Sequence, residues 1–242
     1  MHLRYNHFRL IVFKFSYFKP FSRAPTFLPG YSRLLDPVHR VSLIDFDSAE
    51  YWKKRYAAGG NSGGGSYGAL ADFKAQSLNC FIQENSVNSI VEYGSGDGNQ
   101  LGLIKVANYL GLDVSPDAIK RTNDNYATDP SKRFQLYDPD TFKTTPNEQA
   151  DMSISMDVIL HLTEDARYEK YMGYLFKSGI RFIGIFNTAT DKQLEKMALH
   201  NRYRDHRNWI TKNSEFVEVK VEMLPASIGY PTETGFFYYA AT

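Results

Sequence analysis

The sequence predicts an α/β fold built around a parallel sheet. From about residue 90 onward, short apolar runs alternate with longer amphipathic segments, which is the order expected of strand-helix-strand units. Four of the apolar runs end at or close to an acidic residue. Parallel sheets bind ligands at the carboxyl ends of their strands, so these acids would meet at one edge. With 242 residues, 43% of them hydrophobic, the chain is large enough to bury such a core.

The first predicted strand, Ile-Val-Glu-Tyr, contains Glu92 and leads into a glycine-rich turn with Gly94, Gly96 and Gly98 at alternate positions. Glycine permits positive φ and lets a ligand approach the main chain closely. We expect the turn to feed a helix whose free N–H groups face a nucleotide-type ligand. The dinucleotide fingerprint needs its third glycine where Asn99 stands, so the pattern is not that of an NAD site.

The second predicted strand lies within residues 106–115 and ends at Asp113, 17 residues after Gly96. An acid at this place can accept two hydrogen bonds from ribose hydroxyls. Ser115 and Pro116 then predict the start of a helix, with serine as N-cap and proline as the first helical residue. The alternative for Asp113 is that it acts as a second helix cap.

Two further strands follow in order. Residues 134–138 predict a third strand, ending at Asp138, which sits in an Asp-Pro-Asp sequence and could equally be a turn residue. Residues 150–162 predict a fourth strand and the turn after it. Beyond it we expect a helix at 164–177, a fifth strand at 180–187, a helix at 191–197, and two antiparallel strands at 216–221 and 235–240.

The pattern Glu-x-Gly-x-Gly-x-Gly, followed by Gly-Leu-Asp-Val-Ser-Pro-Asp-Ala-Ile, resembles the class I S-adenosylmethionine (SAM) dependent methyltransferases over residues 90–162. The resemblance implies a Rossmann-like sheet, mostly parallel with one reversed strand, and helices on both faces. It implies SAM as the cofactor, with an acid and glycines around its methionine part, and an acid near its adenine. The cofactor-binding candidates are Arg55, Tyr56, Glu92, Gly94, Gly96, Gly98, Asp113, Ser115, Asp138 and Met156.

Residues 46–88 predict N-terminal helices and a glycine-rich lid. Ser48 can cap the first helix, and residues 59–65 contain five glycines, which cannot hold a fixed shape unaided. The glycine segment is either a lid over the site or a linker between two helices. Together with the preceding Tyr-Trp-Lys-Lys-Arg-Tyr, it resembles bacterial methyltransferases of surface-polysaccharide or small-metabolite pathways, in which this segment covers the cofactor. Arg55, Tyr56 and Tyr67 are candidates on that resemblance.

Residues 1–45 predict a basic, aromatic, proline-containing extension outside the core at 89–242. Residues 1–40 hold seven Arg or Lys and one acid, whereas the remainder holds 21 basic and 26 acidic residues. We expect a poorly ordered arm, an upstream start, or a contact with a membrane surface or partner protein. The apolar run at 10–18 is shorter than the roughly 20 residues of a membrane span. One cysteine and no secretory cleavage site favour a cytoplasmic location.

The part of the site that would bind the methyl acceptor is predicted at the turn after the fourth strand. Methyl transfer is an in-line displacement in which the protein aligns the acceptor and removes its proton. His161 and Asp157 are the catalytic candidates; His161 is either a general base or a packed residue. Residues 200–207 are a solvated face or a grip on an anionic substrate. The substrate-binding candidates are Tyr67, His200, Arg202, Arg204 and His206, and no residue spacing predicts a metal site.

The predicted function is SAM-dependent methylation of a small molecule, with O-methylation of a sugar or glycan precursor favoured. One alternative is a non-catalytic scaffold that binds an adenosine cofactor. The other is an NAD(P)-dependent oxidoreductase, which the missing third glycine and a missing Tyr-x-x-x-Lys pair disfavour. A net charge of +1 does not favour nucleic acid as a partner. The fold does not fix the acceptor.

Overall fold

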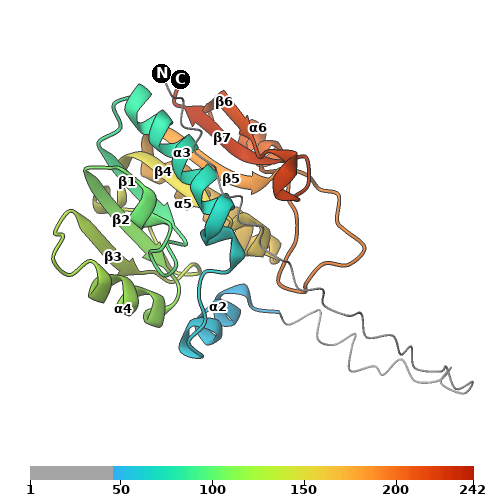
Figure 1. The fold of residues 1–242 in the computed structure, drawn as a ribbon. Helices are drawn as coiled ribbons and strands as arrows, with labels where there is room; N and C mark the ends of the chain where they lie inside the picture. The colour runs from blue at the N-terminus through green and yellow to red at the C-terminus, as the bar shows by residue number, and fades with distance from the viewer. Residues whose placement is uncertain (1–45) are drawn as a thin grey trace, which may run out of the picture. The chain divides into compact units, whose positions relative to one another are not determined.

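The computed structural model describes residues 46–242, and the predicted extension 1–45 lies outside the described residues (Figure 1). The described part contains one seven-stranded sheet of order β3-β2-β1-β4-β5-β7-β6. Its strands are β1 Ser89–Tyr93, β2 Asn108–Asp113, β3 Lys132–Leu136, β4 Ala150–Met156, β5 Gly179–Thr188, β6 Val217–Met223 and β7 Thr234–Ala240.

The sheet is mostly parallel, and β7 is its reversed strand. β1 pairs in parallel with β2 and β4, β2 with β3, and β4 with β5. β7 runs antiparallel to both of its neighbours, β5 and β6. The predicted fold class is therefore confirmed, and the carboxyl ends of β1, β2, β3 and β4 meet at one edge.

Five helices of eight or more residues are described: α2 Ser48–Ala57, α3 Gly68–Glu84, α4 Pro116–Asn125, α5 Asp165–Ser178 and α6 His206–Asn213. α4 begins as predicted, because the Ser115 side chain accepts a hydrogen bond from the Ala118 N–H and Pro116 is the first helical residue. α2 is capped by Asp47, which accepts from the Glu50 N–H, so Ser48 lies inside the helix rather than at its cap.

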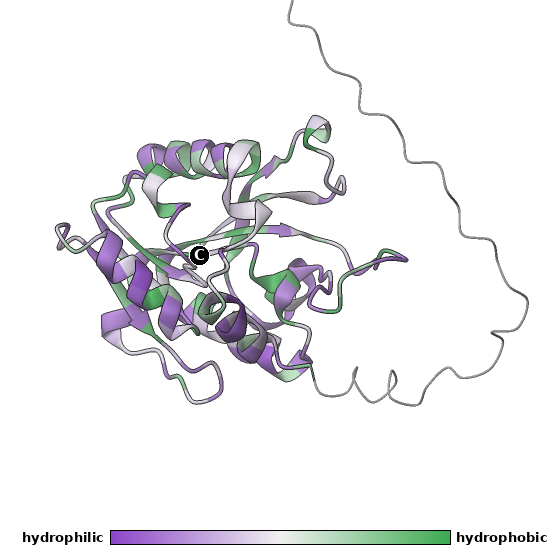
Figure 2. Cartoon of the chain, turned by 60° about the horizontal axis from the view of Figure 1, so that its bottom comes forward, coloured by the Kyte–Doolittle hydropathy of each residue, from purple (hydrophilic) through white to green (hydrophobic). Residues whose placement is uncertain are grey.

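The five inner strands of the sheet, β2, β1, β4, β5 and β7, are mostly buried, and neighbouring residues of a strand point to opposite faces. In β1, Ile90 packs in the core formed with α3, whereas Val91 and Tyr93 pack in the core formed with α5. Figure 2 shows hydrophilic and hydrophobic residues alternating along the helices, as expected when one helix face covers a sheet. No helix in residues 46–242 has the length and apolar character needed to cross a bilayer.

Two predicted elements differ from the structure. The helix expected after the glycine turn is only the 3₁₀ turn Leu101–Leu103, because residues 94–107 form a short connection to β2 that includes several glycines. The helix expected at 191–197 is irregular, and α6 forms further along the chain instead. The side chains of Asp191 and Gln193 form hydrogen bonds with a later segment instead. Asp191 accepts from the Asp205 N–H, and Gln193 exchanges hydrogen bonds with the Tyr203 backbone.

Candidate functional site

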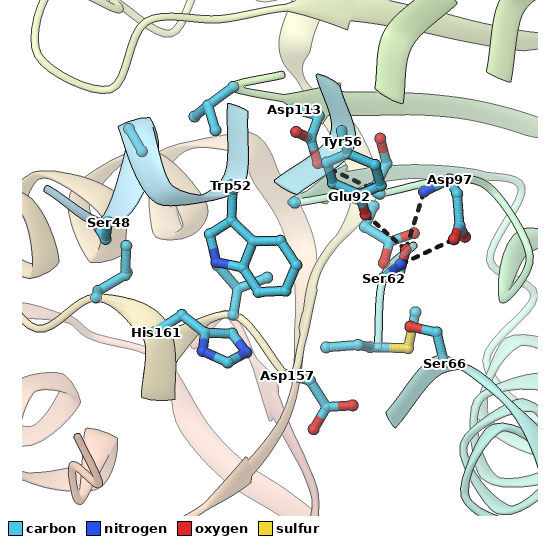
Figure 3. Close-up of a pocket in the computed structure, with 18 of the residues that line it drawn as sticks. Ser48, Trp52, Tyr56, Ser62, Ser66, Glu92, Asp97, Asp113, Asp157 and His161 are labelled. Carbon is cyan, nitrogen blue, oxygen red and sulfur yellow. Dashed lines mark hydrogen bonds between the residues drawn. The ribbon is translucent and has the colours of Figure 1, made fainter. Parts of the chain in front are cut away.

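A cavity opens at the carboxyl edge of the sheet (Figure 3). Its walls come from α2, the glycine-rich segment, α3, the turn after β1, and the ends of β2, β3 and β4. Eight of the residues predicted for the site line this cavity: Tyr56, Glu92, Gly94, Gly96, Asp113, Met156, Asp157 and His161. The structure thus brings together residues from four separate parts of the sequence.

The glycine turn has the positive φ values that the sequence predicted: +80° at Gly94, +60° at Gly96 and +78° at Gly98. A Cβ on Gly96 would lie 2.3 Å from the Ser62 Oγ and 2.9 Å from the Tyr56 hydroxyl oxygen. The missing side chain therefore makes room for the glycine-rich segment and α2, and not only for a ligand.

The glycine-rich segment is fixed to this turn through Asp97. The Ser62 N–H donates to the Asp97 carboxylate (2.9 Å), the Asp97 N–H donates to the Ser62 Oγ (3.0 Å), and the Tyr67 hydroxyl also donates to Asp97 (2.8 Å). Burial opposes ionisation of Asp97, but these hydrogen bonds hold its pKa below the ordinary value. Sequence reasoning missed Ser62 and Asp97, although Asp97 stands between two motif glycines.

Two buried acids face the cavity from the ends of β1 and β2. The Asp113 carboxylate accepts from the Gly96 N–H and the Ser115 N–H, both at 2.9 Å, so it joins the glycine turn to the start of α4. Burial raises the pKa of Asp113 to about 6, although the two N–H donors lower it. Glu92 accepts a short hydrogen bond from the Tyr109 hydroxyl, and burial raises its pKa to about 7.

The turn after β4 carries both catalytic candidates. Asp157 has a left-handed backbone, φ +58°, and its carboxylate lies 2.7 Å from the Lys74 Nζ. The His161 Nδ1 lies 3.1 Å from the His200 carbonyl oxygen, which can only accept. Nδ1 therefore carries the ring proton, and Nε2 keeps its lone pair. Burial lowers the pKa of His161, so the ring is neutral at neutral pH. Figure 3 shows Trp52 beside His161.

Four predicted cofactor residues do not line the cavity. Arg55 donates to the Asn61 carbonyl in the glycine-rich segment (2.8 Å), and Ser115 caps α4. The Gly98 carbonyl accepts from the Tyr126 hydroxyl. Asp138 is exposed and binds its own turn, accepting from the Asp140 N–H (2.9 Å). Its neighbours Tyr137 and Pro139 line the cavity instead, and sequence reasoning missed both.

The expectation that Arg204 and His206 contact the substrate is corrected by their burial. The Arg204 guanidinium lies 2.7 Å from the Asp165 carboxylate and also donates to the Leu162 and Thr163 carbonyls. His206 is fully buried between Asn187 and Tyr239, and burial lowers its pKa to about 3. Neither residue lines the cavity, because each is used to hold the fold together.

The other three substrate candidates also lie outside the cavity wall. Arg202 pairs with Asp165 (3.0 Å) and donates to the Thr163 carbonyl. His200 stacks on the Tyr51 ring, with centroids 4.6 Å apart, and positions His161 through its carbonyl. Tyr67 is exposed and faces a separate groove beside Gly98.

The strand order, the glycine turn and the two acids at strand ends define the methyltransferase class of Rossmann-like fold. Residues 91–182 match the family model described as a methyltransferase domain. No curated protein matches the chain in sequence. Residues 91–182 are therefore a methyltransferase domain, and SAM is its cofactor.

Solved structures share the fold at low identity. Magnesium protoporphyrin IX methyltransferase from Synechocystis PCC 6803, with bound SAM, has a TM-score of 0.59 at 14% identity, covering 82% of this chain and 99% of that one. The N-methyltransferase NodS from Bradyrhizobium japonicum WM9, with S-adenosyl-L-homocysteine (SAH), has 0.61 at 13%, covering 81% and 99%. A putative O-methyltransferase from Klebsiella pneumoniae has 0.54 at 12%, covering 86% and 96%.

The cavity fits SAM chemically. Ser95 and Gln100 line it, and two of their buried atoms, the Ser95 Oγ and the Gln100 Oε1, have no hydrogen-bond partner within the described residues and can serve a polar ligand. Val114, Tyr137 and Pro139 give one end an apolar wall suited to a flat base. Asp113 and Glu92 supply acceptors on the cavity wall.

Proposed function

We propose that this protein transfers a methyl group from SAM to a hydroxyl group of a small molecule, with a sugar or glycan precursor as the favoured acceptor. Bound SAM supplies an activated, positively charged methyl donor. The protein must then hold the acceptor oxygen in line and take its proton. The observation that carries the proposal is the His161 ring, whose proton is fixed on Nδ1 by the His200 carbonyl.

A neutral Nε2 on the cavity wall is the group that an alcohol acceptor requires, since a hydroxyl is a poor nucleophile until its proton is removed. The Asp157 carboxylate faces the same cavity and can accept a hydrogen bond from a second hydroxyl of the acceptor. The Trp52 ring, which packs edge-on against His161 with centroids 4.8 Å apart, adds an apolar surface for a sugar ring. This combination supports a polyhydroxylated acceptor.

The test is a screen of sugar nucleotides and phosphorylated sugars with methyl-labelled SAM, using the native chain beside His161→Ala. A labelled product with its methyl on oxygen, formed by the native chain only, supports the proposal. A product methylated on nitrogen or carbon would overturn it. SAM binding without any transfer across a wide acceptor panel would favour the non-catalytic scaffold, and thermal stabilisation by NAD(P) but not SAM would favour an oxidoreductase.

We also propose a cytoplasmic location, with a membrane or protein contact made by residues 1–45. The basic and aromatic composition of that segment supports the contact. Cell fractionation of the full chain and of a chain lacking residues 1–45 tests it. A membrane-bound fraction that persists without the segment would contradict it.

A further inference from the structure

Lys74 of α3 is a buried cation on the cavity wall. Its side chain is only 1% exposed, and its Nζ lies 2.7 Å from the Asp157 Oδ2 and 5.3 Å from the centre of the Phe186 ring. An ammonium group has three donors. Asp157 is the single hydrogen-bond acceptor that the described residues offer it. Two donors of the ammonium group are therefore left without a partner in this part of the chain. Because burying a charge is costly unless its hydrogen bonds are made, an anionic group in the cavity would be a favourable partner for them.

Gln100, in the connection after the glycine turn, has an unused acceptor and is hydrogen-bonded to α3. Its Nε2 donates to the Ala71 carbonyl (3.1 Å), and Ala71 lies three residues before Lys74, which puts both on one face of α3. The amide orientation follows from this bond, because a carbonyl can only accept. Gln100 lines the cavity, and its Oε1 is buried and has no partner within residues 46–242. A donor from Lys74 and an acceptor from Gln100 thus belong to residues that line the same cavity beside the same turn of α3.

An α-amino-acid group matches this pair. Its carboxylate needs a donor, and its ammonium, separated from the carboxylate by one carbon, needs an acceptor. SAM has such a group at one end, and its adenosine end carries no charge. Burial raises the pKa of Glu92, but Glu92 lies close enough to Lys74 for the lysine charge to lower it, so a second acidic side chain lies near the lysine.

We infer that Lys74 and Gln100 bind the amino-acid end of SAM, with Lys74 on its carboxylate and Gln100 Oε1 on its ammonium. The inference rests on the SAM-dependent activity and does not depend on which acceptor is used. Lys74 then has two tasks, since it also holds the Asp157 carboxylate at the turn after β4. Neither residue belongs to the glycine motif, and Lys74 precedes the segment that matches the family model.

Calorimetry with two ligands tests the inference without any acceptor. SAH contains the amino-acid end, whereas 5′-methylthioadenosine keeps the adenosine and the sulfur but lacks that end. Lys74→Met should weaken SAH binding by about 10- to 100-fold, the loss of one charge-assisted contact, and change methylthioadenosine binding less than about twofold. Gln100→Leu should act in the same direction with a smaller loss. Lys120→Met is the matched control, since Lys120 is exposed on α4 and pairs with Asp124 there.

The ratio of the two affinities separates binding from folding. An equal loss for both ligands would show a structural role for Lys74 and overturn the inference, as would unchanged SAH binding. Unchanged SAH binding with a raised KM for the acceptor would assign the lysine to an acceptor carboxylate instead, and would also overturn it. Failure of the SAM-dependent function is recognised separately, because the native chain would then not bind SAH at all.

Discussion

Gly96 lies directly against Ser62: a Cβ on Gly96 would come within 2.3 Å of the Ser62 Oγ. The two residues are 34 positions apart, one in the turn after β1 and the other in the glycine-rich segment. Asp97 adds hydrogen bonds in both directions between the same two segments. The segment and the turn therefore form one structural unit, and we propose that this unit is the lid of the cofactor site.

Gly96→Ala should disrupt this unit. The added Cβ meets Ser62, and φ of +60° is unfavourable for alanine, so we expect a loss of about 1–3 kcal/mol in SAH binding free energy. The double variant Gly96→Ala/Ser62→Gly removes the clash but not the backbone strain, so it should recover only part of the loss. Calorimetry measures both. Native affinity in the single variant would show that the segment moves aside freely.

Asp113→Ala should weaken SAH binding by about 1.5–3 kcal/mol, because it removes a buried acceptor at the cavity. It also leaves the Gly96 and Ser115 N–H groups without their partner, so part of the cost will appear as reduced stability. Asp113→Asn keeps one acceptor oxygen and should lose less. Thermal unfolding without ligand separates the two effects. If the alanine variant loses stability but binds SAH normally, Asp113 acts only as a cap.

His161→Ala should lower kcat by roughly 10²–10⁴-fold if the ring is the general base. The neutral ring is the active form, and its pKa lies below the ordinary 6.5, so activity should persist below pH 6.5 and fall only as the pH drops through the lowered pKa. His200→Ala is the control, since it keeps the carbonyl that orients His161. If His161→Ala changes kcat only slightly and its activity falls at low pH as in the native chain, His161 is not the general base.

Glu92 should make the ligand-free protein less stable as the pH rises. Its folded pKa is about 7 and its ordinary value 4.5, so the folded state holds the proton more tightly. Its stabilising contribution is complete below pH 4.5, falls between 4.5 and 7, and is constant above, a change on the order of 3 kcal/mol. Asp113, with a folded pKa of about 6, adds a slope of the same sign at lower pH.

Glu92→Gln removes this ionisation and keeps an acceptor for the Tyr109 hydroxyl. Urea unfolding at pH 5 and pH 8 should show that the variant gains stability relative to the native chain at pH 8 but much less at pH 5. The opposite slope from His206, whose pKa is lowered to about 3, is present in both proteins and cancels in the comparison. Parallel pH profiles for the two proteins would contradict the buried ionisation.

The strands and the acids at their ends could be predicted because the patterns that indicate them lie in neighbouring residues of the sequence. Apolar runs of strand length, glycines at alternate positions and a Ser-Pro helix start each depend on neighbouring residues, and the structure confirms them at β1, β2 and α4. The register of the sheet then brings Glu92 and Asp113 to one edge.

The contacts of single polar side chains could not be predicted, because their partners are distant in sequence. Lys74 meets Asp157 across 83 positions, and Arg204 meets Asp165 across 39. A charged run such as 200–207 has the same composition whether it faces a ligand or pairs with the protein. The failed helix at 191–197 has a similar cause, since side-chain hydrogen bonds to a later segment replaced the helical ones.

The short connection between β1 and β2 leaves α3 to complete the wall of the cavity. Because only a 3₁₀ turn follows the glycines, α3 supplies the neighbouring wall: its Asn79 exchanges hydrogen bonds with Leu103 and Lys105, and its Lys74 reaches the cavity. The stretch that matches the family model begins at residue 91, after α3 has ended. We therefore expect that a fragment limited to the matched stretch would lack part of the cavity wall, and that transferring the activity to another protein would require the residues from α2 onward.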